Sequence, residues 1–319
     1  MTMELSETSK PEKPVRPSLF KRIRSSDLWW SFTHSKTAIF GATILAILIL
    51  TALLAPLIAP QNPYDGAQLD MWKAELPPIW HDGGEMPYLL GSDTQGRDML
   101  SAVLYGTRIS IVIGIASVVL SLVIGLIAGL VAGFFGGFID NLLMRIGDVM
   151  LSIPTILVAI LVSTVVRQML PESLREIGAS AVLVFAIALS SWVQYARTVR
   201  AQAIVEAGKD YVQAARLIGV PARRIMGKHI LPNTLTPIMV AATLNFGMAI
   251  LTEATLSFLG IGMPPSQPSL GTLIRIGNQF LFAGSWWIVL FPVIQLCLLV
   301  VAVNLLGDWL RDALNPKLR

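Results

Sequence analysis

Long apolar runs alternate with shorter polar segments along this chain. Six of the runs are long enough to cross a membrane: residues 38–59, 109–135, 142–166, 177–197, 233–258 and 285–307. A helix rises about 1.5 Å per residue, so roughly 20 apolar residues cross a hydrocarbon core of about 30 Å. Backbone groups in lipid need hydrogen bonds within their own segment, which a helix supplies. The pattern predicts an all-α integral membrane protein with six transmembrane helices, and we expect Pro154 and Pro292 to kink two of them.

The polar segments complete the expected organisation. The chain is predicted to contain a cytoplasmic tail (1–36), a first transmembrane helix (37–59), an extracytoplasmic segment (60–106), a core of five helices (107–307) and a second cytoplasmic tail (308–319). The first apolar run is too long for a signal peptide and lacks a clear cleavage site, so we expect it to remain as a span. Trp29 and Trp30 suggest an interfacial segment at the end of the first tail.

The distribution of Lys and Arg predicts the orientation. With both termini in the cytoplasm, 18 of the 24 Lys and Arg residues fall on the inner side and 6 on the outer side. Cytoplasmic loops of membrane proteins carry the excess of positive charge, so this orientation is favoured. It places the segment 206–232 in the cytoplasm. An odd number of spans would put the termini on opposite sides and disturb this partition.

Composition agrees with a membrane protein. Hydrophobic residues make up 54% of the chain and charged residues 14%, compared with about 25% charged in soluble domains. The net charge of +4 is small, and basic residues in such a protein mark topology, so we expect lipid rather than nucleic acid as a partner. The single cysteine, Cys297, excludes an intrachain disulfide and a Cys-rich metal site.

The second apolar run carries small residues at every fourth position. They are Ser117, Ser121, Gly125, Gly129 and Gly133. Small residues at this spacing allow helix backbones to approach closely in lipid. We therefore expect this face to pack tightly against another helix. The alternative is an ordinary glycine-rich span, since glycine is common in membrane helices.

The polar segment 206–232 reads as two short helices. Asp210 and Gln213 fit a capping box at the start of the first one. One face of that helix is expected to contain Tyr211, Ala214, Ala215 and Ile218. Gly219 suits the end of the first helix, and Pro221 suits the first turn of the second. From the pattern alone, this is an amphipathic helix pair at the membrane surface.

The same segment resembles the cytoplasmic EAA loop of permease subunits of ATP-binding-cassette importers. That motif reads Glu-Ala-Ala, three residues, Gly, nine residues, then Ile-x-Leu-Pro. The spacing is kept here from Gln213, Ala214 and Ala215 through Gly219 to Leu231-Pro232. Gln213 stands in place of the Glu and His229 in place of the Ile. The wider string is similar to the C-type permeases of dipeptide and oligopeptide importers, a branch that also serves nickel complexes.

Further strings carry the same resemblance across most of the chain. They are Leu90–Ser101, Gly136–Asn141, Trp286-Trp287 and Gly307–Pro316. In the first string, Asp93 and Thr94 favour turns and caps, and we expect Arg97 to pair locally with Asp98. We interpret it as a capped re-entry into the membrane. Contact with an external binding protein is the alternative.

Two carboxylates, Asp148 and Glu253, fall within or close to predicted spans. A charge at the bilayer centre costs at least about 2.5 kcal/mol, so each invites a functional hypothesis. Asp148 lies three residues after Arg145, and we expect a structural ion pair or an interhelix contact there. For Glu253, pore lining and interhelix hydrogen bonding both remain open.

The sequence lacks the motifs of familiar catalytic sites. It contains no Gly-x-x-x-x-Gly-Lys-Ser/Thr loop, no His-Glu-x-x-His and no Gly-x-Ser-x-Gly. We therefore predict no catalytic residue, metal site or bound cofactor in this chain, and ATP and Mg would bind to partner subunits.

The resemblance implies a type I importer permease in the bacterial inner membrane. Its partners would be a homologous second permease, two ATP-binding subunits and an extracytoplasmic solute-binding protein. The expected ATPase-coupling residues are Tyr211, Gln213, Ala214, Ala215, Arg216 and Gly219. The alternative is a self-sufficient channel or secondary transporter that uses the intramembrane carboxylates. A membrane-embedded enzyme is disfavoured because no nucleophile–base or metal constellation appears.

Overall fold

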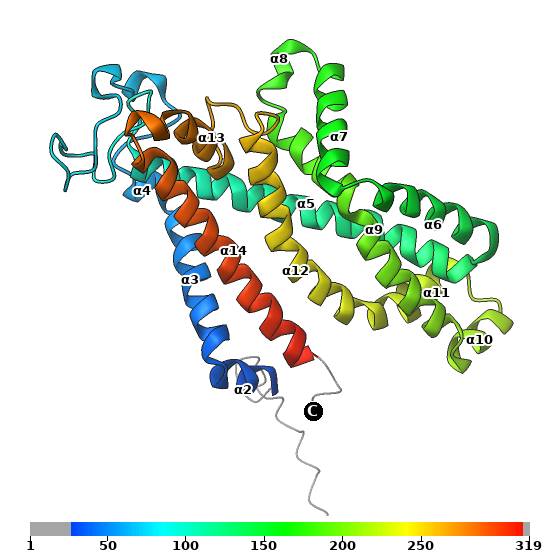
Figure 1. Ribbon diagram of the computed structural model, residues 1–319. Coiled ribbons are helices and arrows are strands. Elements are labelled where there is room, and N and C mark those ends of the chain that lie inside the picture. Colours follow the sequence, from blue (N-terminus) through cyan, green and yellow to red (C-terminus); the bar gives the residue numbers. More distant parts are fainter. Residues whose placement is uncertain (1–26, 315–319) are drawn as a thin grey trace, which may run out of the picture.

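The computed structural model describes residues 27–314 as a helical protein (Figure 1). Most of the basic residues of the first tail, and the end of the last resemblance string, lie outside the described residues. In chain order the helices are α2 (Asp27–His34), α3 (Lys36–Leu53), α4 (Ala55–Ile58), α5 (Met99–Phe135), α6 (Gly137–Ser152), α7 (Thr155–Met169), α8 (Glu172–Arg175), α9 (Ala179–Ala207), α10 (Asp210–Leu217), α11 (Ala222–Ile225), α12 (Leu231–Phe258), α13 (Leu270–Phe280) and α14 (Trp287–Leu314). Short 3₁₀ segments occur at Gly66–Gln68, Met71–Lys73 and Leu281–Ala283, and a π-helical turn at Met226–Ile230.

Five helical segments are long and apolar enough to cross a membrane. They are α3, α5, α9, α14 and the combined segment Ala222–Phe258, which includes α11, the π turn and α12. The pair α6 and α7 makes a sixth if it is counted as one span, although its two helices are bent by 99°. The described chain is thus an all-helical membrane protein, as predicted.

The expectation of one kinked helix over residues 142–166 is wrong, because two separate helices, α6 and α7, occupy this range. Ile153 and Pro154 both have extended backbone, with ψ values of 135° and 130°. Proline disfavours helical backbone in the residue before it and has no N–H to donate, so α6 ends before the proline and α7 starts after it. Pro292 lies inside α14, which continues past it.

Helix α5 shows how local sequence sets the ends of a span. The Ser101 N–H donates to Asp98 Oδ2 at 2.7 Å, which caps the first turn. At the other end, Gly136 has φ of +63°, a conformation that glycine adopts without steric cost. Between these residues the helix runs for 37 residues.

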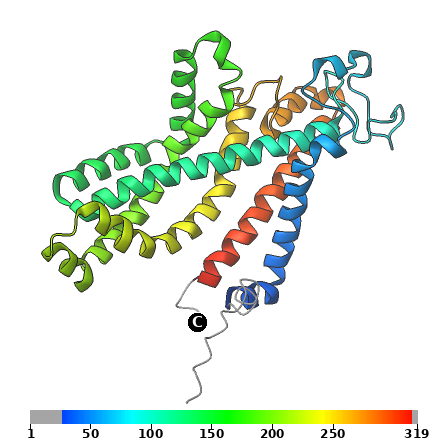
Figure 2. The ribbon, with the colours of Figure 1, turned by 180° about the vertical axis from the view of Figure 1, so that it is seen from behind.

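The helices form an elongated bundle whose two ends differ. Helix α3 packs beside α14, α14 packs on α12 and α13, and α5 crosses α9. The segment 59–98 between α4 and α5, which we call the outer segment after its expected location, lies at one end with α13 and α8 in both views, whereas α2, α10 and the last described residues lie at the other (Figures 1 and 2). Helix α2, the end of α14 and α10 therefore share one side of the molecule.

The small-residue face of α5 lies against α9. A Cβ atom added at Gly125 would lie 2.6 Å from Trp192 O, and one at Gly129 would lie 2.5 Å from Ala196 O. At Gly133 an added Cβ would lie 2.7 Å from Ala203 Cβ. Because these neighbours are mainly backbone atoms, the two helices could not accept larger residues without moving apart.

We predict that Gly129→Ala destabilises the protein because the new Cβ meets the backbone of α9. Overpacking of this kind costs about 1–3 kcal/mol. The matched control is Gly66→Ala, since nothing lies within 4 Å of a Cβ added at Gly66. Thermal unfolding of the purified protein in detergent measures the difference. Equal melting temperatures for the two variants would contradict the packing argument.

Candidate functional site

The start of helix α10 differs from the sequence prediction, whereas its end agrees with it. The capping box is wrong: α10 begins at Asp210 without a side-chain cap, and Gln213 Nε2 donates instead to Ala207 O at 2.9 Å. The predicted end at Gly219 is confirmed. Gly219 has φ of +78°, and the Val220 N–H donates to Ala215 O at 3.0 Å. This is a Schellman motif, which needs a residue in the left-handed conformation.

The second predicted short helix is the beginning of a span. Pro221 is the N-cap of α11, and α11 continues through the π turn into α12. The 37-residue segment Ala222–Phe258 therefore leads from the α10 turn into the membrane. Because one tight turn joins α10 to this segment, a movement of α10 can be transmitted to α12.

The two apolar stripes of α10 face in different directions. Val212 and Ala215 are buried in a core cluster with Ile225 and Ile230. Leu217 and Ile218 are 88% and 79% exposed. The expected common face of Tyr211, Ala214, Ala215 and Ile218 is therefore divided, because Ala215 points into the chain and the other three are exposed. The sequence prediction missed Val212 as a core residue and Leu217 as an exposed one.

Polar side chains fasten α10 to the neighbouring helices. Tyr211 Oη donates to Glu206 Oε2 at 2.6 Å, and Lys209 Nζ donates to Glu206 Oε1 at 2.6 Å. Asn233, in the first turn of α12, donates to Glu206 Oε2 at 3.0 Å. The hydrogen bond to Glu206 raises the pKa of Lys209 and also that of Tyr211. The sequence prediction did not include Glu206 or Asn233.

A third helix, α5, also contacts α10. Arg216 Nη2 donates to Phe134 O at 3.3 Å, and the guanidinium carbon lies 4.4 Å from the centre of the Phe134 ring. A cation over an aromatic face is attracted by the ring quadrupole. Helix α10 thus contacts α5, α9 and α12 at those ends of the three helices that lie on its side of the molecule.

The two carboxylates of the spans contact other helices. Asp148 Oδ1 accepts from Arg197 Nη2 of α9 at 2.6 Å, which confirms the expected ion pair or interhelix contact, with Arg197 and not the nearby Arg145 as the partner. Glu253 is fully buried and accepts hydrogen bonds from Ser110 of α5 at 2.8 Å and from Ser257 at 2.7 Å. Its burial between helices matches the interhelix reading that the sequence left open.

A cavity of about 340 Å³ opens among α5, α7, α9 and α12. Its polar lining consists of hydroxyl and amide side chains: Ser117, Ser121, Thr155, Ser191, Gln194, Tyr195, Asn245, Thr252 and Thr255. Pro154, at the break between α6 and α7, also lines it. Irregular backbone at membrane depth is tolerated where protein buries it or where it borders a water-filled cavity. Because no charged residue of the described chain lines the cavity, it offers hydrogen-bonding groups but no charge to a polar molecule.

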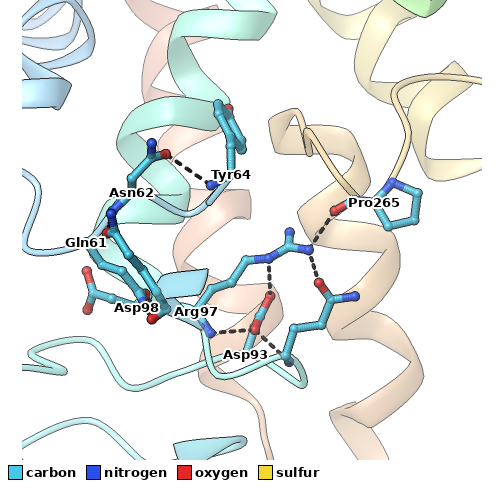
Figure 3. A network of polar contacts seen from close by, with 9 residues as sticks. Gln61, Asn62, Tyr64, Asp93, Arg97, Asp98 and Pro265 are labelled. Atoms are coloured by element: carbon cyan, nitrogen blue, oxygen red, sulfur yellow. Dashed lines mark hydrogen bonds and ion pairs between the residues drawn. The ribbon is translucent and has the colours of Figure 1, made fainter. Parts of the chain in front are cut away.

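The outer segment is held by a buried ion pair (Figure 3). Arg97 is 2% exposed, its Nε lies 3.8 Å from Asp93 Oδ2, and its Nη2 donates to Pro265 O at 2.7 Å. Asp93 Oδ1 accepts from the N–H groups of Gln95 and Arg97. Burial raises the pKa of Asp93 and lowers that of Arg97, because desolvation disfavours both charges.

Asp98 has a separate role from the one predicted. Arg97 pairs with Asp93, so the expected local pair between Arg97 and Asp98 is wrong. Asp98 caps α5, and its N–H donates to Gln61 Oε1 at 2.8 Å (Figure 3). The Leu90–Ser101 string is therefore a buried connection between the outer segment, α5 and the loop before α13. This geometry agrees with the capped re-entry rather than with an exposed contact surface.

The sequence is similar to a known family of transport proteins. Residues 123–319 match the family described as binding-protein-dependent transport system inner membrane component. The chain belongs to this family. Residues 24–78 match the N-terminal TM domain of oligopeptide transport permease C. The chain is thus a transmembrane permease subunit of a transport system.

Curated relatives cover almost the whole chain. The di/tripeptide transport system permease protein DppC of Pseudomonas aeruginosa (strain UCBPP-PA14) is 39% identical over 303 residues, 95% of each chain. The dipeptide transport system permease protein DppC of Escherichia coli (strain K12) is 44% identical over 293 residues, 92% of this chain and 93% of the relative. A putative peptide transport system permease protein of Brucella suis biovar 1 (strain 1330) is 40% identical over 279 residues, covering 88% and 87%.

We predict that Arg97→Ala loosens the outer segment, because it leaves Asp93 as an unpaired buried carboxylate. Breaking a buried ion pair costs about 3–5 kcal/mol. Hydrogen exchange over residues 60–98 should accelerate. The control is Arg175→Ala, since the Arg175 side chain is 47% exposed and pairs with a Glu172 that is 90% exposed. Unchanged exchange in Arg97→Ala would contradict a structural role and favour a contact role for this string.

Proposed function

We propose that this chain is the permease subunit of an ATP-driven importer of dipeptides, oligopeptides or a similar small solute. The peptide class is supported by the similarity to DppC relatives over most of the chain. The observation that carries the coupling role is the geometry of α10, which exposes Leu217 and Ile218 while its other side is attached to α5, α9 and α12.

The expected partners follow from the family. A homologous second permease would supply the other half of the translocation pore, and an extracytoplasmic binding protein would deliver the solute. ATP and Mg would bind to two partner ATPase subunits, because this chain has no phosphate-binding loop. We place α10 and both termini in the cytoplasm of the bacterial cell, since this orientation puts 18 of the 24 Lys and Arg residues of the sequence on the inner side.

The proposed mechanism uses α10 as a rigid contact to one ATPase. Leu217 and Ile218, with Tyr211, Gln213 and Ala214 beside them, would enter a groove of that subunit. When the ATPases close on ATP, α10 would move and displace the ends of the helices to which it is attached. The cavity among α5, α7, α9 and α12 would then change its access from one side of the membrane to the other.

The solute path that we propose runs through this cavity. Its hydroxyl and amide groups can exchange hydrogen bonds with the amide groups of a peptide. A neutral lining binds weakly, which suits a molecule that has to leave again. Selectivity would then rest mainly with the binding protein.

The alternative of a self-sufficient channel or secondary transporter has less support. It needs carboxylates that meet a passing ion or proton. Glu253 is fully buried between helices, and Asp148 is paired with Arg197. Both groups are occupied by contacts within the chain.

We predict that Leu217→Asp separates the permease from its ATPases without unfolding it. A buried leucine at an interface contributes about 1.5–3 kcal/mol, so recovery of the ATPases should fall about tenfold or more. Copurification from detergent-solubilised membranes through a tag on this chain measures the loss. The matched control is Leu174→Asp on α8, an exposed leucine at the opposite end of the molecule.

Leu217 is a better probe than Gly219. Any side chain at Gly219 is strained by the positive φ, so a Gly219→Glu variant would change the turn as well as the surface. Full ATPase recovery with Leu217→Asp would contradict the proposed contact.

We predict that Glu253→Gln retains ATP-driven uptake at close to the wild-type rate. The glutamine amide can still exchange hydrogen bonds with Ser110 and Ser257, because hydroxyl groups both donate and accept. Solute uptake and ion flux in proteoliposomes that contain the whole transporter measure the outcome. Abolished transport, accompanied by lost ion flux, would favour the channel or secondary-transporter reading.

A further inference from the structure

We infer that Glu206 is a positioning residue that fastens α10 to the first turn of α12, so that both helices move together during transport. The inference rests on the proposed coupling role of α10. It concerns four residues from α9, α10, α12 and the turn between α9 and α10, which we name the Glu206 cluster: Glu206, Lys209, Tyr211 and Asn233.

The carboxylate of Glu206 is the centre of this cluster. Its Oε1 accepts from Lys209 Nζ at 2.6 Å, and its Oε2 accepts from Tyr211 Oη at 2.6 Å and from Asn233 Nδ2 at 3.0 Å. The Asn233 amide also lies 3.0 Å from Tyr211 Oη, which closes a triangle. One carboxylate from the end of α9 thus joins α10 to α12.

The burial of Glu206 makes its hydrogen bonds energetically important. The Glu206 side chain is 8% exposed, although it lies at the end of a span next to a polar loop. A buried carboxylate that loses a donor keeps its desolvation cost, whereas an exposed one finds water instead. The Lys209 side chain is 48% exposed, so its bond to Glu206 contributes less than those of Tyr211 and Asn233.

The position of Asn233 along α12 supports a mechanical role. It follows the π turn Met226–Ile230 and Pro232, where regular helix pairing is interrupted. Asn233 Nδ2 also lies 3.2 Å from His229 O, a carbonyl of that turn. The hydrogen bond from Asn233 to Tyr211 of α10 can therefore resist independent movement of α10 and α12.

A simple cap of α9 or a solvated charge pair would not need these contacts. The bond from Lys209 is of that local kind, because it joins residues three apart. The bonds that Asn233 makes to Glu206 and Tyr211 span 27 and 22 residues and link different helices. The arrangement therefore favours transmission between helices over local capping.

The test uses the complete transporter in proteoliposomes, with the ratio of solute imported to ATP hydrolysed as the readout. Glu206→Gln keeps the shape of the side chain but removes the charge that three donors share. We expect this ratio to fall about tenfold, with ATP hydrolysis retained, because a hydrogen bond to a charged group contributes on the order of one factor of ten. The matched control is Glu172→Gln, an exposed glutamate on the other side that should keep the wild-type ratio.

A double variant makes the test specific to this contact. Glu206→Gln combined with Asn233→Asp exchanges the carboxylate and the amide across the 3.0 Å contact. The cluster then has one carboxylate again, and the ratio should recover. If Glu206→Gln does not assemble, Tyr211→Phe removes one donor while keeping the ring, and the ratio should fall by a smaller factor.

The outcomes are distinct from those for the proposed function. A wild-type transporter that imports no solute with ATP would overturn the proposed function itself. If the wild-type transporter imports solute with ATP and the ratio is unchanged in Glu206→Gln, only the inference would be overturned. The same holds for an unchanged ratio in Tyr211→Phe where that variant is used. A lowered ratio that the exchange variant fails to restore would also overturn it, because the effect would then not depend on the contact between α9 and α12.

Discussion

The close contact between α5 and α9 is the constraint on which the rest of this structure depends. It exists because Gly125, Gly129 and Gly133 leave no side chain between the two backbones. The contact fixes the ends of both helices on the side where α10 lies. Helix α10 follows α9 after only two residues, and Arg216 reaches the end of α5. Helix α10 therefore has a defined place, because the two spans that it contacts are held together.

The buried charged side chains of the described residues, and the half-exposed Asp148, are each paired or hydrogen-bonded within the chain. Glu253 accepts from two serines, Asp148 accepts from Arg197, and the buried Arg97 lies beside Asp93. Lipid offers no water to satisfy such groups, so their partners have to come from the protein. The cavity among α5, α7, α9 and α12 differs in being lined by neutral hydroxyl and amide groups. This contrast separates the groups that hold the structure from those that a solute would meet.

Much of the fold could be predicted from the sequence, because long apolar runs leave few structural choices in lipid. The break after Ser152 was underestimated, since a proline predicts a bend but not that Ile153 is extended as well. The faces of α10 were assigned incorrectly because an eight-residue helix with two apolar stripes fits either assignment. The expected pair of Arg97 with Asp98 was wrong because Asp98 caps α5, and Arg97 pairs with Asp93 instead. The ion pair or interhelix contact of Asp148 was expected, but its partner Arg197 lies 49 residues further along the chain and could not be identified from the sequence. Glu206 was missed because its partner Asn233 lies 27 residues further along the chain.

The central claim is that α10 and α12 move as one unit, and pulsed electron paramagnetic resonance measures this most directly. In a Cys297→Ser background, spin labels at Asp210 and Phe258 report the distance from α10 to the far end of α12. A second pair, Asp210 and Leu50, reports the distance to α3, which lies apart from α10 (Figure 1). Trapping the complete transporter with a non-hydrolysable ATP analogue should change the second distance and leave the first unchanged. A change of several ångströms in the first distance would contradict the account.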